Sequence, residues 1–190
     1  MLEVNLAQRV PAVRFEEAGL IGPLRVSLQP SIGRLSFRAR AAALGGRREV
    51  AGFPVDGAVN TRSDKGDRVA LRLGPDEWML LCNDEETDTA VEAVLEAMAG
   101  KAHSLVDVSH RDVTFEVRGA MGDAVINSGC PLDLSPAAFP AGTATRTLFG
   151  KAEIVLARIS DTTWQITCWR SFGAYVQGYL VEAARDFADA

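Results

Sequence analysis

The stretch 105–112, LVDVSHRD, holds most of the side chains through which this chain could do chemistry. Asp107, Ser109 and His110 are the residue types of a catalytic triad, in which an imidazole held by a carboxylate takes the proton of a serine hydroxyl. In an extended backbone, however, Asp107 and Ser109 share one face and His110 points to the other. Adjacent serine and histidine do not readily form the hydrogen bond that this mechanism needs. The stretch therefore predicts a strand end, where Asp107 and Ser109 bond backbone donors and His110 and Arg111 line a turn.

Other catalytic and metal-binding patterns are missing from the sequence. The only further histidine is His103, and no G-x-S-x-G nucleophile motif occurs. The cysteines Cys82, Cys130 and Cys168 have no C-x-x-C spacing, which argues against a zinc site and against a disulfide framework. They are typical of reduced, buried thiols in a cytoplasmic protein. The two glycine-rich phosphate-binding motifs, G-x-G-x-x-G and G-x-x-x-x-G-K-[ST], are both absent. The residues by themselves therefore indicate no catalytic, cofactor-binding or metal-binding position.

Charge and hydropathy narrow the class of protein further. The 190 residues carry a net charge of −5, which disfavours nucleic acid because such surfaces need an excess of positive charge. Residues 1–60 differ from the rest, with eight arginines against five acidic residues. No aromatic row interleaves these arginines, so they predict a solvated or partner-facing surface. The first ten residues lack the features of a secretory signal, and the apolar runs are far too short to span a membrane, so we expect a cytoplasmic protein.

The sequence pattern of the elements that position these residues occurs twice along the chain. Residues 34–46 resemble 112–124, and residues 60–82 resemble 144–168. The matched positions are Phe37 with Phe115, Arg40 with Arg118, Arg62 with Arg146, Gly66 with Gly150, Arg72 with Arg158, Trp78 with Trp164, and Cys82 with Cys168. Because tryptophan and cysteine are rare, their recurrence in register favours an internal duplication over chance. The two tryptophans alternate with smaller residues and are expected to anchor the core.

Each copy predicts the order strand, helix, strand, strand, strand, helix. Apolar residues at helical spacing mark closing helices within 84–100 and 171–187, and the segment 103–109 supplies a strand that joins the copies. The predicted fold class is α+β, with two duplicated ferredoxin-like (split β-α-β) halves, antiparallel sheets, and helices on one face. We expect an N-terminal arm, 1–32, laid over the first repeat. A single compact domain, 33–190, would then contain the repeats 33–100 and 103–190.

Five stretches taken together resemble the gamma subunit family of heterotetrameric sarcosine oxidase. They are LGPDEWMLL (73–81), LVDVSHR (105–111), GCPLDLSPAAFPAG (129–142), RTLFGKAEIVLAR (146–158) and CWRSFGAYVQGYLVEAARDF (168–187). The DVSH stretch is also similar to the folate-binding aminomethyltransferases, which include the T-protein of the glycine cleavage system. That resemblance implies a folate-binding core of duplicated ferredoxin-like halves. The chain is too short for the C-terminal barrel of those transferases.

The resemblance implies a non-catalytic gamma subunit that packs against the large alpha subunit and assists assembly. The complex would oxidise sarcosine to glycine, with formation of hydrogen peroxide and transfer of the one-carbon unit to tetrahydrofolate. FAD, FMN, NAD and tetrahydrofolate would belong to the larger subunits and zinc to the smallest. The resemblance therefore implies no cofactor and no catalytic residue in this chain. Our candidate interface residues are Arg38, Arg40, Trp169, Arg170 and Phe172.

Two other functions stay open on the sequence. A stand-alone folate-binding one-carbon carrier, similar to an aminomethyltransferase, would need a central pocket with an acid for the pterin, for which Asp107 is the candidate. A small enzyme of unrelated chemistry would have to use His110. The sequence leaves open whether the complex takes sarcosine or another N-methyl amine, which surface meets the partner, and whether the isolated chain self-associates.

Overall fold

Alternating polar and apolar residues form two antiparallel sheets, in keeping with the two-residue period of a strand. The computed structural model describes residues 20–21 and 24–187. The first sheet consists, in order across its width, of β6 (Thr61–Lys65), β7 (Arg68–Gly74), β8 (Glu77–Cys82), β3 (Gly33–Ala39) and β9 (His103–Asp107). The second consists of β1 (Leu20–Ile21), β2 (Leu24–Leu28), β10 (Asp112–Arg118), β13 (Thr163–Trp169), β12 (Ala152–Ser160) and β11 (Ala144–Phe149). A two-stranded ribbon joins β4 (Glu49–Val50) to β5 (Phe53–Pro54).

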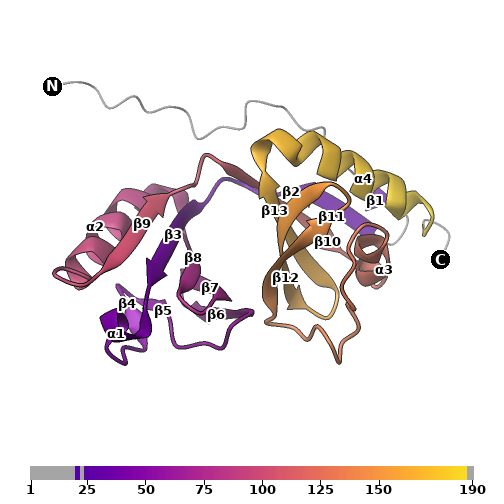
Figure 1. Ribbon diagram of the computed structural model, residues 1–190. Helices are drawn as coiled ribbons and strands as arrows, with labels where there is room; N and C mark the ends of the chain where they lie inside the picture. The colour runs from indigo at the N-terminus through magenta and orange to yellow at the C-terminus, as the bar shows by residue number, and fades with distance from the viewer. Residues whose placement is uncertain (1–19, 22–23, 188–190) are drawn as a thin grey trace, which may run out of the picture.

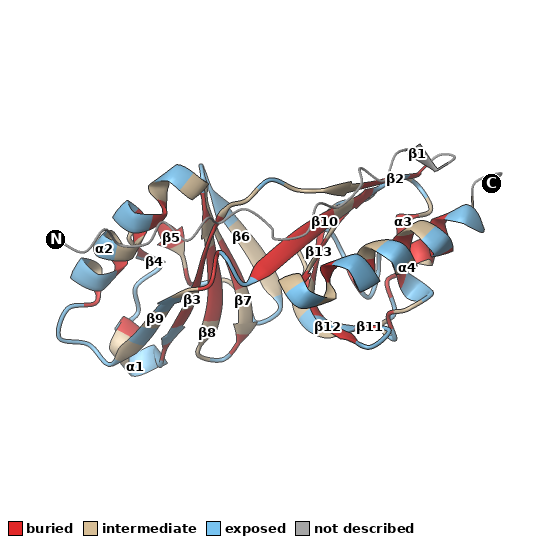
Figure 2. Cartoon of the chain, turned by 90° about the horizontal axis from the view of Figure 1, so that it is seen from above, coloured by how far each residue is buried: buried red, intermediate tan, exposed pale blue. Residues whose placement is uncertain are grey.

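Helices lie on the outer face of each sheet, so that the other faces of the sheets are turned toward each other (Figure 1). The helical segments are α1 (Ala41–Leu44), η1 (Asp84–Glu86), α2 (Thr87–Ala97), α3 (Gly122–Asn127), η2 (Arg170–Phe172) and α4 (Gly173–Arg185). In the view from above, buried residues line the strands and the inward side of α2 and α4, while the outward sides of these helices are exposed (Figure 2). None of the described helices is long and apolar enough to cross a membrane.

The predicted duplication is confirmed by the strand order. Apart from the β4–β5 ribbon of the first half, each half has the order strand, helix, three strands, helix, and β6-β7-β8-β3-β9 corresponds to β11-β12-β13-β10-β2. The positions matched between the two copies of the sequence occupy equivalent places in the two halves. Arg72 is opposite Trp78 and Arg158 is opposite Trp164, and in both hairpins the register shifts directly after the arginine. Each guanidinium lies over its tryptophan ring, 5.0 Å from the ring centre in the first half and 4.7 Å in the second.

The two halves exchange one strand each. Strand β2 precedes β3 in the chain but pairs with β10 of the second sheet, and β9 precedes β10 but pairs with β3 of the first. The expectation that the N-terminal arm lies over the first repeat is therefore wrong for residues 24–28. The physical reason is that Leu24 and Val26 are fully buried in the core of the second half. The remaining arm residues before 24, except 20–21, lie outside the described residues, and the division into an arm and two repeats stays a prediction.

Three clusters of buried residues hold the fold together. One lies between the first sheet and its helices, and a second between the second sheet and α3 and α4. The third lies between the two sheets and contains Leu71, Met79, Val108, Ala144 and Ala157. Because side chains alternate along a strand, the polar residues of β3 and β10 that face away from the helices face this space between the sheets.

Candidate functional site

The LVDVSHRD stretch is the crossover by which the chain passes from the first sheet to the second. Strand β9 ends at Asp107 and β10 begins at Asp112. The second crossover, residues 29–32, runs from β2 to β3. Backbone bonds tie each crossover to the strand of the other: Val108 N donates to Arg34 O at 2.9 Å, and Gln29 N donates to Thr114 O at 2.8 Å. The strand exchange thus brings residues from the start of the chain against the stretch that sequence patterns single out.

Asp107 and Ser109 stabilise this crossover. The Oδ1 atom of Asp107 accepts hydrogen bonds from the Ser109 backbone N–H at 2.9 Å and from the Ser109 hydroxyl. Ser109 Oγ accepts in turn from the backbone N–H of Arg34 at 2.9 Å. Ser109 is 2% exposed, so this hydroxyl is buried as well as engaged in both directions. The prediction that these two side chains bond backbone donors at a strand end is confirmed.

The histidines lie away from this pair. His110 is exposed in the turn, whereas Nδ1 of His103 lies 2.8 Å from the carbonyl oxygen of Lys101 at the start of β9. The Ser109 hydroxyl therefore has a carboxylate partner and a backbone partner but is not bonded to an imidazole. A buried serine without an imidazole to take its proton is a poor nucleophile. The arrangement does not have the geometry of a triad.

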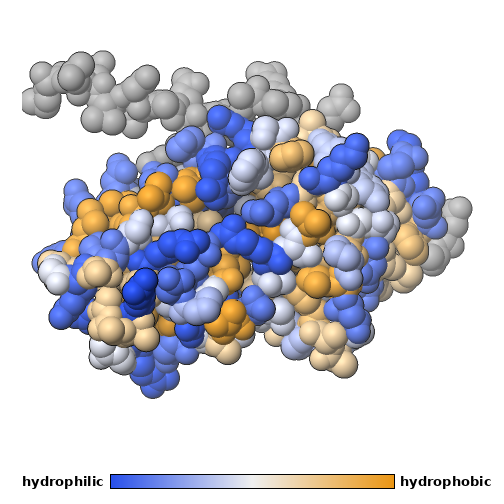
Figure 3. All heavy atoms as spheres, in the orientation of Figure 1, coloured by the Kyte–Doolittle hydropathy of each residue, from blue (hydrophilic) through white to orange (hydrophobic). Residues whose placement is uncertain are grey.

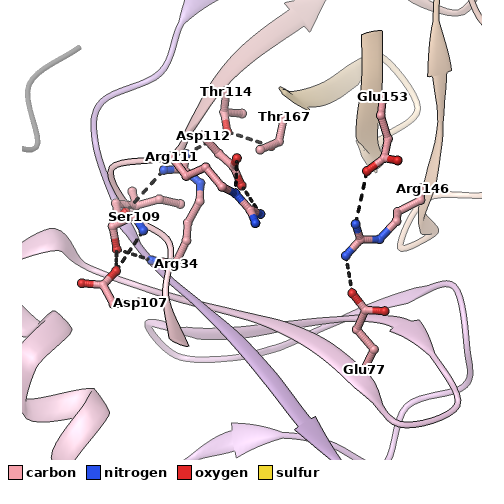
Figure 4. Close-up of polar contacts among 11 residues, drawn as sticks. Arg34, Glu77, Asp107, Ser109, Arg111, Asp112, Thr114, Arg146, Glu153 and Thr167 are labelled. Carbon is pink, nitrogen blue, oxygen red and sulfur yellow. Dashed lines mark hydrogen bonds and ion pairs between the residues drawn. The ribbon is translucent and has the colours of Figure 1, made fainter. Parts of the chain in front are cut away.

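A buried polar cluster connects the two sheets beside the crossovers. Arg34 of β3 is 3% exposed, and its Nη2 atom donates to Thr114 Oγ1 of β10 at 2.8 Å. Thr114 shares a further bond of 2.7 Å with the hydroxyl of Thr167 on β13. Desolvation lowers the pKa of Arg34, and the nearby carboxylates of Asp112 and Asp84 oppose that shift. Figure 4 shows the cluster where the two sheets meet.

The carboxylate of Asp112 is already bound by its neighbour. Arg111 donates to its two oxygens, with Nε at 2.9 Å and Nη2 at 3.1 Å. The hydrogen bond to Asp112 raises the pKa of Arg111. Sequence patterns did not identify Arg34, Thr114 or Thr167 as part of this site. Their alternation with apolar residues is typical of any strand face, and only the second sheet makes that face buried.

A second ionic group bridges the halves at the other side of Figure 4. Glu77 of β8 accepts from Arg38 at 2.9 Å and from Arg146 of β11, and Arg146 also lies 3.4 Å from Glu153. These side chains are partly exposed, and isolated surface pairs contribute about 0–1 kcal/mol. The group therefore links the two halves while contributing little to their stability.

The three cysteines do not have the features of reactive thiols. Cys82, Cys130 and Cys168 are all free and buried, as predicted. Desolvation raises the pKa of Cys168 to about 12, and it also raises the pKa of Cys82 above its ordinary value. A thiol with a raised pKa holds its proton at neutral pH and is a weak nucleophile. Across residues 20–21 and 24–187, no group of histidine, cysteine and acidic side chains has the arrangement of a metal site.

A pocket between the sheets is the place where this fold could hold a small molecule. Its walls are mostly apolar, with Arg34, Thr114, Gln165 and Thr167 as the polar part. The apolar lining residues are Ile32, Leu71, Met79, Leu81, Val155 and Ala157. The lining therefore includes a cation and, among the described residues, no carboxylate. Asp107, the acid that a folate site would need, is not among the lining residues and is bonded to Ser109. These residues do not fit tetrahydrofolate.

Comparison with known proteins decides the family. The model of the family described as sarcosine oxidase, gamma subunit family, matches residues 41–186. The chain belongs to this family. The sarcosine oxidase subunit gamma of Corynebacterium sp. (strain P-1) is 29% identical over 176 residues, which cover 93% of this chain and 82% of that protein. The subunit gamma of Arthrobacter sp. is 28% identical over 164 residues, covering 86% and 77%.

Solved structures confirm the predicted fold class for this gamma-family chain. A chain of the heterotetrameric sarcosine oxidase from Corynebacterium sp. U-96, in complex with pyrrole 2-carboxylate, superposes with a TM-score of 0.80 at 23% identity, covering 91% of this chain and 90% of that one. The glycine cleavage system aminomethyltransferase T from Bartonella henselae gives 0.64 at 12% identity, covering 87% of this chain and 50% of that one. The chain thus has the fold of about half of that transferase.

The candidate interface residues of the gamma-family chain fall into two groups. Trp169, Arg170 and Phe172 lie at the end of β13 and in η2, next to the crossover, where Arg170 N donates to Arg111 O at 2.8 Å. Trp169 is 49% exposed, whereas Phe172 packs partly against the core of the second half. Arg38 and Arg40 are exposed at the far end of β3. Their contact with a partner remains a proposal.

Proposed function

We propose that the chain is a non-catalytic gamma subunit of a sarcosine oxidase complex, in which it assists assembly by packing against the larger subunits, alpha in particular. The match of the gamma subunit family to residues 41–186 carries this proposal. The site geometry agrees with it, because Ser109, Asp107 and Asp112 are engaged in contacts that fix the crossover between the two sheets. These contacts give Asp107, Ser109 and Asp112 a structural role in the crossover.

The chemistry belongs, in this proposal, to the partner subunits. The complex would oxidatively demethylate sarcosine to glycine, with hydrogen peroxide formed and the one-carbon unit passed to tetrahydrofolate. FAD, FMN, NAD and tetrahydrofolate would be held by the partners, and the complex would be cytoplasmic. This chain would supply packing surface and no reacting group. The folate-binding carrier gains no support, because the pocket between the sheets has a cationic polar end where a pterin site needs an acid.

The experiment is a purification of the tagged chain from its native host grown on sarcosine, followed by mass spectrometry and a visible spectrum. We expect larger chains in fixed ratio with flavin absorbance, and a matched untagged culture should give neither. A colourless chain recovered alone would refute the subunit proposal. The Ser109→Ala variant, purified in the same way, should keep the turnover per flavin of the wild-type complex. A loss of turnover in a fully assembled complex would mean that Ser109 takes part in catalysis.

A further inference from the structure

A second pocket lies where the two crossovers meet the start of α4. Residues from the 29–32 crossover, from β3, from the LVDVSHRD stretch and from η2 line it together. Its polar lining includes Gln29, Ser31, Arg34, His110, Asp112 and Arg170. The strand exchange alone brings these side chains together, because they come from four separate parts of the sequence. On the face of the molecule shown in Figure 3, hydrophilic side chains lie among hydrophobic ones between the two halves.

Positive charge exceeds negative charge around this pocket, although the whole chain has a net charge of −5. Arg34 and Arg170 line it, and the Arg111 guanidinium lies against the Asp112 carboxylate at its edge. Asp112 is the one acid in the described lining, and Arg111 already binds its two oxygens. Asp84 lies close enough to act on Arg34, and it also accepts from the Ser31 hydroxyl at 3.4 Å.

Arg34 is short of a counter-ion for its degree of burial. It is 3% exposed, and its hydrogen bonds go to the neutral oxygens of Thr114 at 2.8 Å and Ile32 at 3.4 Å. Within the described residues, no carboxylate forms an ion pair with Arg34 or with Arg170. The carboxylates of Asp112 and Asp84 act on Arg34 without forming an ion pair with it, so they offset only part of the cost of burying its charge. A further negative group beside Arg34, which the described residues do not supply, would offset the rest of that cost.

We propose that this pocket receives a carboxylate side chain from a partner subunit, bound between Arg34 and Arg170. The inference rests on the proposed function and names the contact that the subunit would make. The pocket is small and partly open to solvent, so it has room for a side-chain carboxylate but not for a whole small molecule.

The test uses the complex as the host makes it. Wild-type chain and a tagged variant are co-expressed at equal levels, and the ratio of the two in the purified complex is measured by intact mass spectrometry. We expect Arg34→Met and Arg170→Met each to be incorporated at least about tenfold less than wild type, because truncating one partner of a buried charge pair weakens binding strongly. The control Arg48→Met removes the same charge from an exposed side chain of the first half and should be incorporated equally.

A stability measurement separates this role from a structural one. The isolated Arg34→Met chain should unfold at the same or a higher urea concentration than wild type, since a desolvated charge has been removed. Thr114 keeps its bond to Thr167, so no hydroxyl is left unpaired. If Arg34→Met instead destabilises the isolated chain while Arg170→Met is incorporated like wild type, the arginines act within the fold and the inference is wrong.

The outcomes distinguish the inference from the proposal beneath it. If wild-type chain recovers no larger subunits, the proposed function fails. If wild type assembles and both arginine variants are incorporated within twofold of Arg48→Met, the pocket inference fails and the subunit proposal stands. Sodium acetate is then the remaining probe of the isolated chain. Stabilisation of wild type but not of Arg34→Met, with equal incorporation, would assign the pocket to a free carboxylate and would overturn the contact with a partner.

Discussion

Replacement of Arg158 by methionine tests how the second half is held together. Arg158 is 2% exposed, and its guanidinium lies 4.7 Å from the ring centre of Trp164. It donates to the carbonyl oxygens of Phe139 at 2.9 Å and Asp161 at 3.0 Å, with longer bonds to Leu134 and Ser160. These bonds fasten the proline-rich loop before β11 to the hairpin that follows β12. Methionine fills a similar volume but provides no donor.

The expected loss of stability follows from these contacts. Each of the two short bonds has a charged donor and contributes about 1.5–3 kcal/mol, and the contact with the ring adds about 0.5–2 kcal/mol. The apolar surface that methionine buries offsets about 1–2 kcal/mol of this. We therefore expect Arg158→Met to lower the free energy of unfolding by about 2–7 kcal/mol, which is large beside the typical effect of a point mutation.

The matched variant is Arg72→Met, at the equivalent position of the first half. Arg72 donates to Gly57 O at 2.7 Å and to Pro75 O at 3.0 Å, and it lies over Trp78, but it is less buried. Its carbonyl acceptors can be hydrated after the substitution, so we expect about half the loss. Urea unfolding of the purified full-length chain, followed by tryptophan fluorescence and circular dichroism, measures both values. A loss below about 1 kcal/mol for Arg158→Met would refute the reasoning.

Four further predictions concern other parts of the fold. All thiols should resist a thiol reagent at pH 8 in the folded chain and react after unfolding. The folded pKa of Cys168, about 12, exceeds that of an unfolded thiol. The contribution of this thiol to stability is therefore complete below about pH 8.5 and is lost as the pH rises toward 12. Cys168→Val should reduce this alkaline loss in pH-dependent unfolding. Ser109→Ala should cost about 1–3 kcal/mol in urea unfolding, because the Arg34 amide loses its acceptor. Gly150→Ala should cost more than Gly66→Ala, since both glycines have positive φ but a Cβ at 150 meets a tyrosine of α4 while one at 66 meets nothing.

Clear results would contradict three of these predictions. Labelling of Cys168 in the folded chain would show that its surroundings admit solvent. A stability of Ser109→Ala within about 0.3 kcal/mol of wild type would mean that water replaces the hydroxyl, so that the crossover is less closed than its contacts imply. Equal melting temperatures for Gly150→Ala and Gly66→Ala would show that the tyrosine moves aside without loss of packing.

The sequence alone indicated the duplication and the strands and helices of the repeated unit. Rare residues recur in register because each half must build the same hairpin, and the pairs Arg72–Trp78 and Arg158–Trp164 lie opposite each other in the structure. The two-residue period marked the strands, and the helical spacing marked α2 and α4. These features are local, since each depends on neighbours along the chain or across one tight turn. The engaged hydroxyl of Ser109 was also predictable, because Asp107 and Ser109 are close in sequence.

Tertiary structure decided which strand pairs with which and which polar face is buried. A short strand carries little information about its partner, so the exchange of β2 and β9 between the sheets is set by the burial of Leu24 and Val26 in the second core. Arg34 alternates with apolar residues as a solvated side chain would, and it is buried because a second sheet packs over that face. The two-residue period fixes the side of a strand on which a residue lies, whereas what covers that side depends on residues far away in the sequence.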